Sequence, residues 1–435
     1  MRERPDMPVS DTALIRSYSG LTRMLSPFLP LWVKRRALQG KEDPSRSSER
    51  FGKSQKPRPE GPLIWMHGAS VGECTMLLPL IDRFLSYNPK LNVLVTSGTL
   101  SSATLLAKRL PKRAFHQYVP LDAPKSVSNF LDHWKPDMAI WAESEIWPNL
   151  IRLTSERNIS MALINARLSE ASLNGWRKRR KSAIALFGCF DKILAADEQT
   201  ANSLSVLLGK NIEPSGNLKD AAPPLSYDEK ELKRLKKNLG NRPVWCAAST
   251  HAGEDELILA AHESLLEEHK NALLILAPRH PERRDDITAL MDKMPLSYRV
   301  RSQAERPLSS NAVYFFDSVG ELGLAYSLSQ ISFVCGSLIK GLKGHNPLEP
   351  ARLGNAVLTG SHISSFADNY MSMFAFNAAE RIFNPDMIAP ALSHLFNNPD
   401  ERLMRAQAAL KFSQSRDEIL DYVWDEISPL FKGRI

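Results

Sequence analysis

The sequence predicts an α/β protein of two domains, each built on a doubly wound parallel sheet. Short apolar runs alternate with longer segments of helical period from Pro62 onward, and this alternation restarts after a Pro-, Lys- and Glu-rich linker at residues 222–242. The chain has 435 residues, more than one ordinary core holds. Its composition, 43% hydrophobic and 24% charged, excludes disordered, fibrous and membrane-embedded classes.

Ten apolar runs predict strands, and a polar turn and a helix-period segment follow each of them. The predicted strands are residues 63–67, 92–96, 138–141, 161–165 and 192–196 before the linker, and 244–248, 272–277, 313–316, 331–335 and 356–359 after it. Open α/β sheets bind ligands at the carboxyl ends of their strands. We therefore expect two Rossmann-like domains facing each other across a cleft, with the functional residues at the strand ends.

Charge and cysteine usage limit the partners and the compartment. The net charge of +8 suggests an anionic partner, which could be nucleic acid, a phospholipid surface or a phosphorylated substrate. The four cysteines are widely spaced and show no metal-ligand pattern, which is typical of buried thiols in a reducing compartment. Residues 1–11 are mixed in charge and contain two prolines, which argues against a secretory signal. We expect a cytoplasmic protein.

The amino-terminal segment, residues 13–33, contains no acidic residue, and Arg16 and Arg23 interrupt its apolar positions. This pattern, with a tryptophan and three cations at its end, fits a helix that lies in the headgroup layer of a membrane. An ordinary amphipathic helix packed on the domain explains it equally well. Residues 40–61 are polar and predict a connector. The expected division is therefore an amphipathic segment at 1–40 that could face a membrane, a first Rossmann-like domain at 41–225 and a second Rossmann-like domain at 226–435.

The turn after the first strand carries Ser70, Gly72 and Glu73. Small residues permit a tight turn into a helix, and Glu73 falls in the first helical turn, where a carboxylate could accept a proton. Ser70 and Glu73 also fit a capping box, which is a purely structural role. The same letters spell G-x-S-x-G, the nucleophile elbow of serine hydrolases.

Polar groups follow two further strands of the first half. Residues 141–149 place Glu143 and Glu145 among two tryptophans and a proline, where they could hold a hydroxyl-rich ligand or simply begin a helix. Residues 165–170 precede a basic cluster at 177–181, which is either a solvated helix face or a contact to anionic lipid. Lys219 closes the first half, either as an exposed linker lysine or as a partner for a phosphate or carboxylate.

The second half offers groups suited to a nucleotide. An arginine and a histidine held between two prolines, at residues 278–281, favour phosphate recognition. A helix that starts with glycine at residue 320 could receive an anion. Glu349, which follows an Asn-Pro pair, could bind ribose hydroxyls or could simply be an acid in the first turn of a helix. The residues of these segments are Pro278, Arg279, His280, Gly320, Glu321, Leu322, Asn346, Pro347, Leu348 and Glu349; Ser249, Gly336 and Ser337 stand at further strand ends.

Six segments together resemble the motif series of the 3-deoxy-D-manno-octulosonic acid (Kdo) transferases, lipid A-specific, in the same order and with similar spacing. They are residues 67–73, 143–149, 165–170, 216–219, 278–283 and 344–350. The resemblance implies a GT-B fold, CMP-Kdo as donor, a lipid A precursor such as lipid IVA as acceptor, and inverting transfer in lipopolysaccharide biosynthesis. It also implies no metal or other cofactor, no nucleic acid as partner, and a peripheral place on the cytoplasmic side of the inner membrane.

Carried over residue by residue, the resemblance makes Glu73 the catalytic base, and Glu143 and Lys219 support for the transition state. It assigns residues 278–280, 320–322 and 346–349 to CMP, with Arg279 on the phosphate. Ser70, Gly72, Ser249, Gly336 and Ser337 are expected as weaker donor or acceptor contacts. The sequence departs from the family pattern at 339–343, which has less glycine and no arginine, and at Gly68, where many relatives have alanine.

Two other classes of function fit parts of the sequence. A serine hydrolase would use Ser70 with a later histidine such as His345, but it would leave Glu73, Arg279 and Glu349 without roles. A basic nucleic-acid or membrane-binding protein without catalysis explains the charge but not the motifs at the strand ends.

Overall fold

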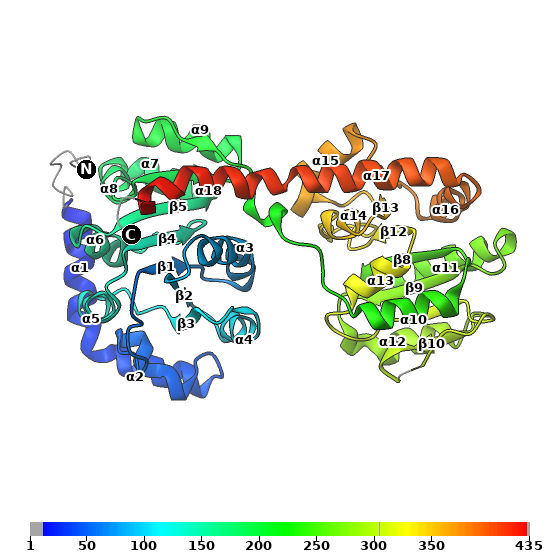
Figure 1. Ribbon diagram of the computed structural model, residues 1–435, viewed down its shortest axis with the longest axis horizontal. Helices are drawn as coiled ribbons and strands as arrows, with labels where there is room; N and C mark the ends of the chain where they lie inside the picture. The colour runs from blue at the N-terminus through cyan, green and yellow to red at the C-terminus, as the bar shows by residue number, and fades with distance from the viewer. Residues whose placement is uncertain (1–11, 304, 433–435) are drawn as a thin grey trace. The chain divides into compact units, whose positions relative to one another are not determined.

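Two sheets of seven parallel strands organise the part of the chain that the computed structural model describes, residues 12–303 and 305–432 (Figure 1). The first sheet contains, in spatial order, β3 (Ala114–Tyr118), β2 (Asn92–Ser97), β1 (Leu63–His67), β4 (Met138–Ala142), β5 (Ser160–Ala166), β6 (Lys192–Ala195) and β7 (Glu213–Pro214). The second contains β10 (Tyr298–Val300), β11 (Val313–Phe315), β9 (Leu273–Pro278), β8 (Val244–Thr250), β12 (Ile331–Val334), β13 (Ala356–Thr359) and β14 (Glu380–Arg381).

Both strand orders step outward from a central strand in two directions, which is the doubly wound arrangement. The ten predicted strands are all present, with ends that shift by at most two residues, and the predicted fold class is confirmed. Four strands were not predicted, namely β3, β7, β10 and β14. All four lie at the outer edges of the two sheets.

Helices cover both faces of the first sheet. Along β1, Ile64 and Met66 enter one core while Leu63 and Trp65 enter the other, because successive side chains of a strand point to opposite faces. The helices that follow its strands are α3 (Val71–Tyr87), α4 (Leu100–Arg109), α5 (Pro124–Trp134), α6 (Pro148–Glu156), α7 (Glu170–Lys178), α8 (Arg180–Phe187) and α9 (Glu198–Leu208), with the 3-10 turn η3 (Leu218–Ala221) after β7.

The second sheet is covered in the same way, with separate apolar cores on its two faces. Its helices are α10 (Glu229–Leu239), α11 (Glu254–Glu268), α12 (Arg284–Met291), α13 (Leu322–Leu328), α14 (Leu348–Arg352), α15 (Ala367–Ala375), α16 (Ile388–Asn397) and α17 (Pro399–Ser415). The short 3-10 turns are η4 (Pro281–Arg283), η5 (Arg301–Gln303), η6 (Ser364–Phe366) and η7 (Pro385–Met387).

The chain divides into two units, and the first unit contains the end of the chain as well as its beginning. It comprises the residues up to Ala222 and those from Asp417 onward, and the second unit runs from Pro223 to Arg416. The last helix, α18 (Asp417–Lys432), contacts α3, β5 and β6 (Figure 1). Its Trp424 and Phe431 pack against Phe84, with ring centroids 4.8 and 5.4 Å away. The expectation that residues 226–435 form one domain is wrong for this helix, because its apolar face completes the core of the first unit.

The amino-terminal segment forms α1 (Ala13–Leu25), the turn η1 (Ser26–Phe28) and α2 (Leu29–Leu38). Polar side chains attach α1 to the start of α6. The fully buried Asn149 accepts from the Ser19 hydroxyl, and its Nδ2 donates to Thr22 Oγ1 at 3.1 Å. Most of the large apolar side chains of this segment are exposed instead: Leu14, Leu21, Met24, Leu25, Phe28, Leu31, Trp32 and Leu38. The segment is therefore attached through Ser19, Thr22 and the buried Ile15, and it leaves many other apolar groups exposed.

Residues 40–61 were expected to be a connector, but they pack on the first sheet. The turn η2 (Pro44–Phe51) contains Arg50, which is 5% exposed and donates to the carbonyls of Gly98 and Val119 at 2.7 and 3.1 Å. Its charge is balanced by the buried Glu42, 2.8 Å from Nε. Two of the charged residues in this polar segment, Glu42 and Arg50, therefore form a buried ion pair. Residues 1–11, the basis of the argument about a secretory signal, lie outside the described residues. None of the described helices has the length and apolar character needed to span a bilayer.

Candidate functional site

Glu73 lies in the first turn of α3, directly after the carboxyl end of β1, and is 7% exposed. Its carboxylate accepts from the backbone N–H of Ala69 at 2.8 Å and from the Ser70 hydroxyl at 2.7 Å. The N–H of Glu73 in turn donates to Ser70 Oγ at 3.3 Å. This is a variant of the capping box, in which the carboxylate accepts from the N–H of Ala69 rather than from that of the N-cap residue Ser70, and it fixes the carboxylate at the rim of the sheet.

Glu143 follows β4 at the same edge of the sheet and forms an ion pair with Lys219. The neighbouring Asn165 is fully buried at the end of β5. Its Nδ2 donates to the Glu143 carboxylate at 3.5 Å, and its Oδ1 accepts from the N–H of Leu218 at 2.8 Å. Glu143 and Asn165 have φ angles of 60° and 53°. Left-handed backbone costs energy in residues other than glycine and is concentrated at functional sites. Asn165 thus holds together the segments that carry Glu143 and Lys219.

A third carboxylate, Glu145, belongs to the same cluster. Burial raises its pKa, the hydrogen bond from Trp147 Nε1 at 2.7 Å opposes that rise, and the charges of Glu73 and Glu143 add to it. Lys219 lies beside the Glu73 turn as well, because a Cβ added to Gly72 would be 3.8 Å from its Nζ. Three acids and one cation therefore meet at the carboxyl ends of β1 and β4. The arrangement can accept a proton and bind hydroxyl groups.

The second unit organises its strand ends around one buried carboxylate. Glu254, at the start of α11, is fully buried and accepts four backbone N–H groups, from His251, Gly336, Ser337 and Leu338, at 2.7 to 3.0 Å. These donors come from the loops after β8 and β12. Glu254 joins the two loops, and its charge is stabilised by the four donors.

Side chains with complementary charge gather over these loops. His251 and His345 share a hydrogen bond between their Nε2 atoms at 2.9 Å. The pKa of His345 is lowered to about 4, chiefly by burial and to a smaller extent by the charges of His251 and Arg279. Burial raises the pKa of the half-buried Glu349 to about 7, although the Arg279 guanidinium opposes the rise. Gly336 has φ 72°, and a Cβ there would lie 2.6 Å from the His345 ring. Only glycine fits this turn, which lets the two histidines meet.

Gly320 and Glu321 line a separate cavity of about 550 Å³, at the carboxyl ends of β10 and β11. Three hydrogen bonds from Arg301, at 2.7 to 3.2 Å, hold the Glu321 carboxylate, and a hydroxyl donor from Ser318 adds a fourth. Burial acts to raise the pKa of Glu321, but these partners outweigh it and the pKa is lowered. Leu322 begins α13, which has seven residues. The helix start expected to receive an anion therefore already carries a carboxylate.

Comparison with known proteins identifies the family. Residues 45–222 match the family described as 3-Deoxy-D-manno-octulosonic-acid transferase (kdotransferase). The 3-deoxy-D-manno-octulosonic acid transferase of Rickettsia bellii is 34% identical over 420 residues, covering 96% of this chain and 100% of that protein. The enzyme of the same name from Haemophilus influenzae is 31% identical and covers 96% of this chain and 99% of its own length.

The chain belongs to the Kdo transferase family. A glycosyltransferase from Rickettsia africae shares the fold with a TM-score of 0.55 at 12% identity, covering 86% of this chain and 99% of that one. The family resemblance inferred from the six motifs is confirmed, and with it the GT-B type of fold.

Within this Kdo transferase framework, the structure brings many of the predicted residues together inside each unit. Ser70, Gly72, Glu73, Glu143 and Lys219 form one group, and Pro278, Arg279, Gly336, Asn346 and Glu349 belong to the loops of another. Asn346 caps α14 by accepting the N–H of Leu348 at 3.0 Å, and Pro347 precedes that helix. The exposed His280 pairs with Glu282.

Two of the weaker candidates have their side chains inside the protein. Ser337 is fully buried, donates to the carbonyl of Val334 and accepts from the N–H of Gly360, each at 2.8 Å. Ser249 is 7% exposed and has φ 60°, so its backbone shapes the end of β8. Asn165 and Glu254 were not assigned a role from the sequence. Asn165 stood in a quoted motif, and the Ser-Thr-His turn at residues 249–251 that leads into Glu254 was the available signal for the other.

The serine hydrolase alternative is not supported. The Ser70 hydroxyl donates to Glu73, whereas the hydrolase considered from the sequence would pair this hydroxyl with a histidine base such as His345. The known relatives are transferases over nearly the whole chain.

Proposed function

We propose that this Kdo transferase moves Kdo from CMP-Kdo to a lipid A precursor of the lipid IVA type, with inversion, and that Glu73 is the general base. The carboxylate cluster with Lys219 at the ends of β1 and β4 carries this proposal. Glu73 removes the proton from the acceptor hydroxyl as its oxygen attacks the anomeric carbon of Kdo. The bond from that carbon to the phosphate oxygen breaks, and CMP leaves with the electron pair.

Lys219 and Glu143 have a supporting role in this reaction. Their ion pair holds the ammonium group beside Gly72, next to the turn that carries Glu73. A cation in this place offers hydrogen bonds to an incoming sugar.

The second unit is suited to the nucleotide. Arg279 is exposed at the end of β9, and its N–H donates to the carbonyl of Thr250 at 3.0 Å, which fixes the start of the loop. Its guanidinium can stabilise the charge that develops on the leaving phosphate. Glu349, close enough to Arg279 to respond to its charge, can accept hydrogen bonds from the ribose hydroxyls.

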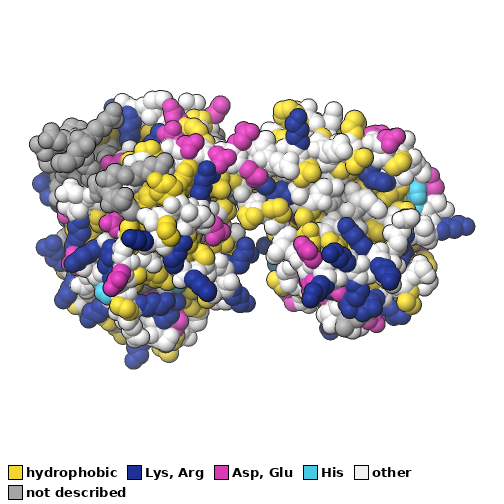
Figure 2. All heavy atoms as spheres, in the orientation of Figure 1, with side chains coloured by type: hydrophobic (Ala, Val, Ile, Leu, Met, Phe, Trp, Pro, Cys, Tyr) yellow, Lys and Arg dark blue, Asp and Glu magenta, His cyan; other side chains and the backbone are white. Residues whose placement is uncertain are grey.

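The exposed apolar side chains of α1, η1 and α2 support a peripheral place on the cytoplasmic face of the inner membrane. Polar bonds fasten α1 to the protein, so these groups are free to enter a headgroup layer. Lys and Arg side chains are spread over the visible face of both units rather than gathered in one stripe (Figure 2). With a net charge of +8, such a surface is drawn to anionic lipid.

The proposed function is tested by incubating the purified protein with CMP-Kdo, with and without lipid IVA in detergent. We expect CMP release only when the lipid is present, a product heavier by whole Kdo units in mass spectrometry, and the opposite anomeric configuration by NMR. Equal CMP release with and without lipid rules out the transfer, and retained configuration rules out the inverting mechanism.

A further inference from the structure

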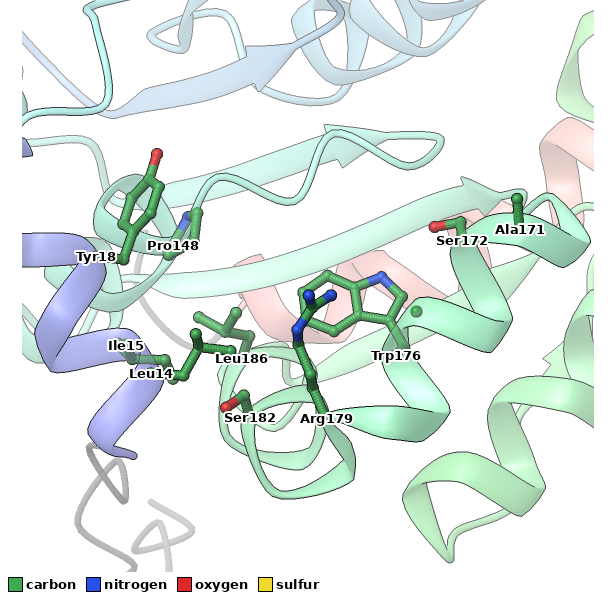
Figure 3. A pocket seen from close by; sticks show the side chains of 11 residues that line it. Leu14, Ile15, Tyr18, Pro148, Ala171, Ser172, Trp176, Arg179, Ser182 and Leu186 are labelled. Atoms are coloured by element: carbon green, nitrogen blue, oxygen red, sulfur yellow. The ribbon is translucent and has the colours of Figure 1, made fainter.

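The first unit contains a second feature that the proposed chemistry leaves without a role. A cavity of about 470 Å³ lies between α1 on one side and α7 and α8 on the other (Figure 3). Leu14, Ile15 and Tyr18 reach it from α1, and Trp176, Arg179 and Leu186 line it from α7 and α8. Its size lies in the range of small-molecule sites.

The lining of this cavity is chiefly apolar, whereas its surroundings are basic. Arg179 is the charged residue among the described side chains that line it. Four further exposed cations flank Arg179 in the sequence. Arg177 and Lys178 end α7, and Arg180 and Lys181 begin α8. An apolar pocket with a cationic rim suits an apolar chain that is joined to an anionic head.

The cavity is continuous with the loop that carries the catalytic candidates. Pro148, at the start of α6, lines the cavity and follows the segment of Glu143 and Glu145 by three residues. Ile146, the residue after Glu145, packs against the apolar cluster of Ile15, Ala185 and Leu186 beside the cavity. A ligand with its chain in the cavity would therefore have its polar end near the carboxylate cluster.

We propose that this cavity binds one acyl chain of the phosphorylated acceptor lipid, with a phosphate of that lipid on the rim formed by Arg177 to Lys181. The inference rests on the proposed function, because it names the part of the acceptor that this pocket holds. Continuity with the Glu143 loop favours the acceptor over a bulk membrane phospholipid, since a bulk lipid gains nothing from lying beside the reacting groups. Binding the chain fixes the acceptor hydroxyl relative to Glu73.

Gly175 gives a variant that fills the cavity without disturbing the fold. It lines the cavity in the middle of α7, and a Cβ there would meet only the guanidinium of Arg179, at 3.9 Å. Gly175→Leu therefore takes up space that the chain needs. Gly20→Leu is the matched control, because Gly20 is also helical and exposed, has nothing within 4 Å of an added Cβ and does not line the cavity.

The kinetic test compares lipid acceptors with long and short acyl chains. We expect Gly175→Leu to lower kcat/KM for the long-chain acceptor about tenfold or more through KM, since each buried methylene contributes about fourfold to binding. The KM for CMP-Kdo should not change, and the variant should lose most of the wild-type preference for long chains. Equal losses in Gly175→Leu and Gly20→Leu, or an unchanged chain preference, would overturn the proposal.

A binding test stands apart from transferase activity. Lipid IVA with brominated acyl chains should quench the fluorescence of Trp176, and Trp176→Phe or Gly175→Leu should remove that part of the quenching while Gly20→Leu keeps it. Quenching by brominated phospholipid of equal strength would assign the cavity to bulk lipid and refute the acceptor. If the protein shows this quenching but no Kdo transfer, the proposed function is wrong and the proposal of a lipid site stands. If it transfers Kdo without this quenching, the proposal of a lipid site is wrong and the proposed function stands.

Discussion

Glu73 shows why a single residue can be hard to assign from sequence. An acid in the first turn of a helix is favoured by capping and by the helix dipole, whether or not it takes part in chemistry. The structure places the side chain in a capping box and at the same time beside two other carboxylates and Lys219. The two roles are compatible, and a substitution that keeps one and removes the other separates them.

Glu73→Gln is that substitution, because glutamine also completes a capping box but cannot accept the proton. We expect the transfer rate to fall about a hundredfold or more, with little change in melting temperature. Ser70→Ala provides the control. It should cost about 1 kcal/mol of stability through the lost cap while leaving most of the activity. A variant Glu73→Gln with near wild-type turnover would exclude this residue as the base.

Glu349 predicts a pH dependence of donor binding. Its pKa is raised to about 7, so the carboxylate that we propose accepts hydrogen bonds from ribose is lost as the pH falls from 8 to 6. We expect the Kd for CMP, measured by calorimetry, to rise as the pH falls over this range. Glu349→Gln should bind more weakly at pH 8 and show a flatter profile. An identical pH profile in the variant would assign the titration to another group.

The same shift has a consequence for stability. The folded pKa of Glu349 lies above its ordinary value of 4.5, so the favourable contribution of the protonated form is complete below pH 4.5 and is lost as the pH rises through 7. Glutamine cannot lose a proton. As the pH rises from 4.5 to 7, the unfolding free energy of the wild-type protein should therefore fall relative to that of Glu349→Gln.

The sequence located the strand-end motifs but not the connections between them. Arg279 could be named because a cation held between two prolines suits a phosphate, whereas Glu73 and Glu349 also fit first-turn helix acids and were assigned their roles through the order and spacing of the six motifs. Asn165 and Glu254 were missed because their function depends on partners 53 and more than 80 residues away, at Leu218 and at Ser337. Such long-range hydrogen bonds leave no periodic pattern in the sequence.

At the scale of elements, the central strands were predictable and the edge strands were not. Buried parallel strands such as β1 are apolar throughout because both faces are covered. The outermost strands β7 and β14 have two residues each, and β10 has three. Edge strands bury less and pair on one side, so their sequences resemble those of loops.

The contact between the β8 and β12 loops depends on one element boundary, the start of α11 at Glu254. Glu254→Gln replaces one acceptor oxygen by an NH₂ group that would face two N–H donors in a fully buried place. We expect a loss of about 3 kcal/mol or more in unfolding free energy and faster hydrogen exchange at Gly336, Ser337 and Leu338. Glu256→Gln, exposed on the same helix, should change neither quantity. Unchanged exchange in Glu254→Gln would contradict the role of the carboxylate.

At the scale of the whole molecule, the exposed apolar groups of α1, η1 and α2 predict membrane binding. Leu21, Phe28 and Leu31 are 51%, 67% and 70% exposed, so changing all three to glutamine should not affect the melting temperature. Binding to anionic phospholipid vesicles, measured by sedimentation, should fall about a hundredfold or more. It should also weaken with salt.

The matched control for this membrane prediction changes exposed apolar side chains elsewhere. Val206, Phe376 and Leu403 are 74%, 67% and 57% exposed and lie outside the amino-terminal segment. Their joint change to glutamine should leave vesicle binding intact. If both triple variants bind vesicles as the wild-type protein does, the segment does not face the membrane.

The place of α18 in the first unit also constrains how the protein is made. During translation the first 222 residues leave the ribosome without Ile419, Trp424 and Phe431, which belong to their core. The second unit, in contrast, is continuous in the chain and has every residue it needs by Arg416. The nascent chain can therefore finish its second unit before its first, whose apolar surface beside α3 stays open until synthesis passes residue 431.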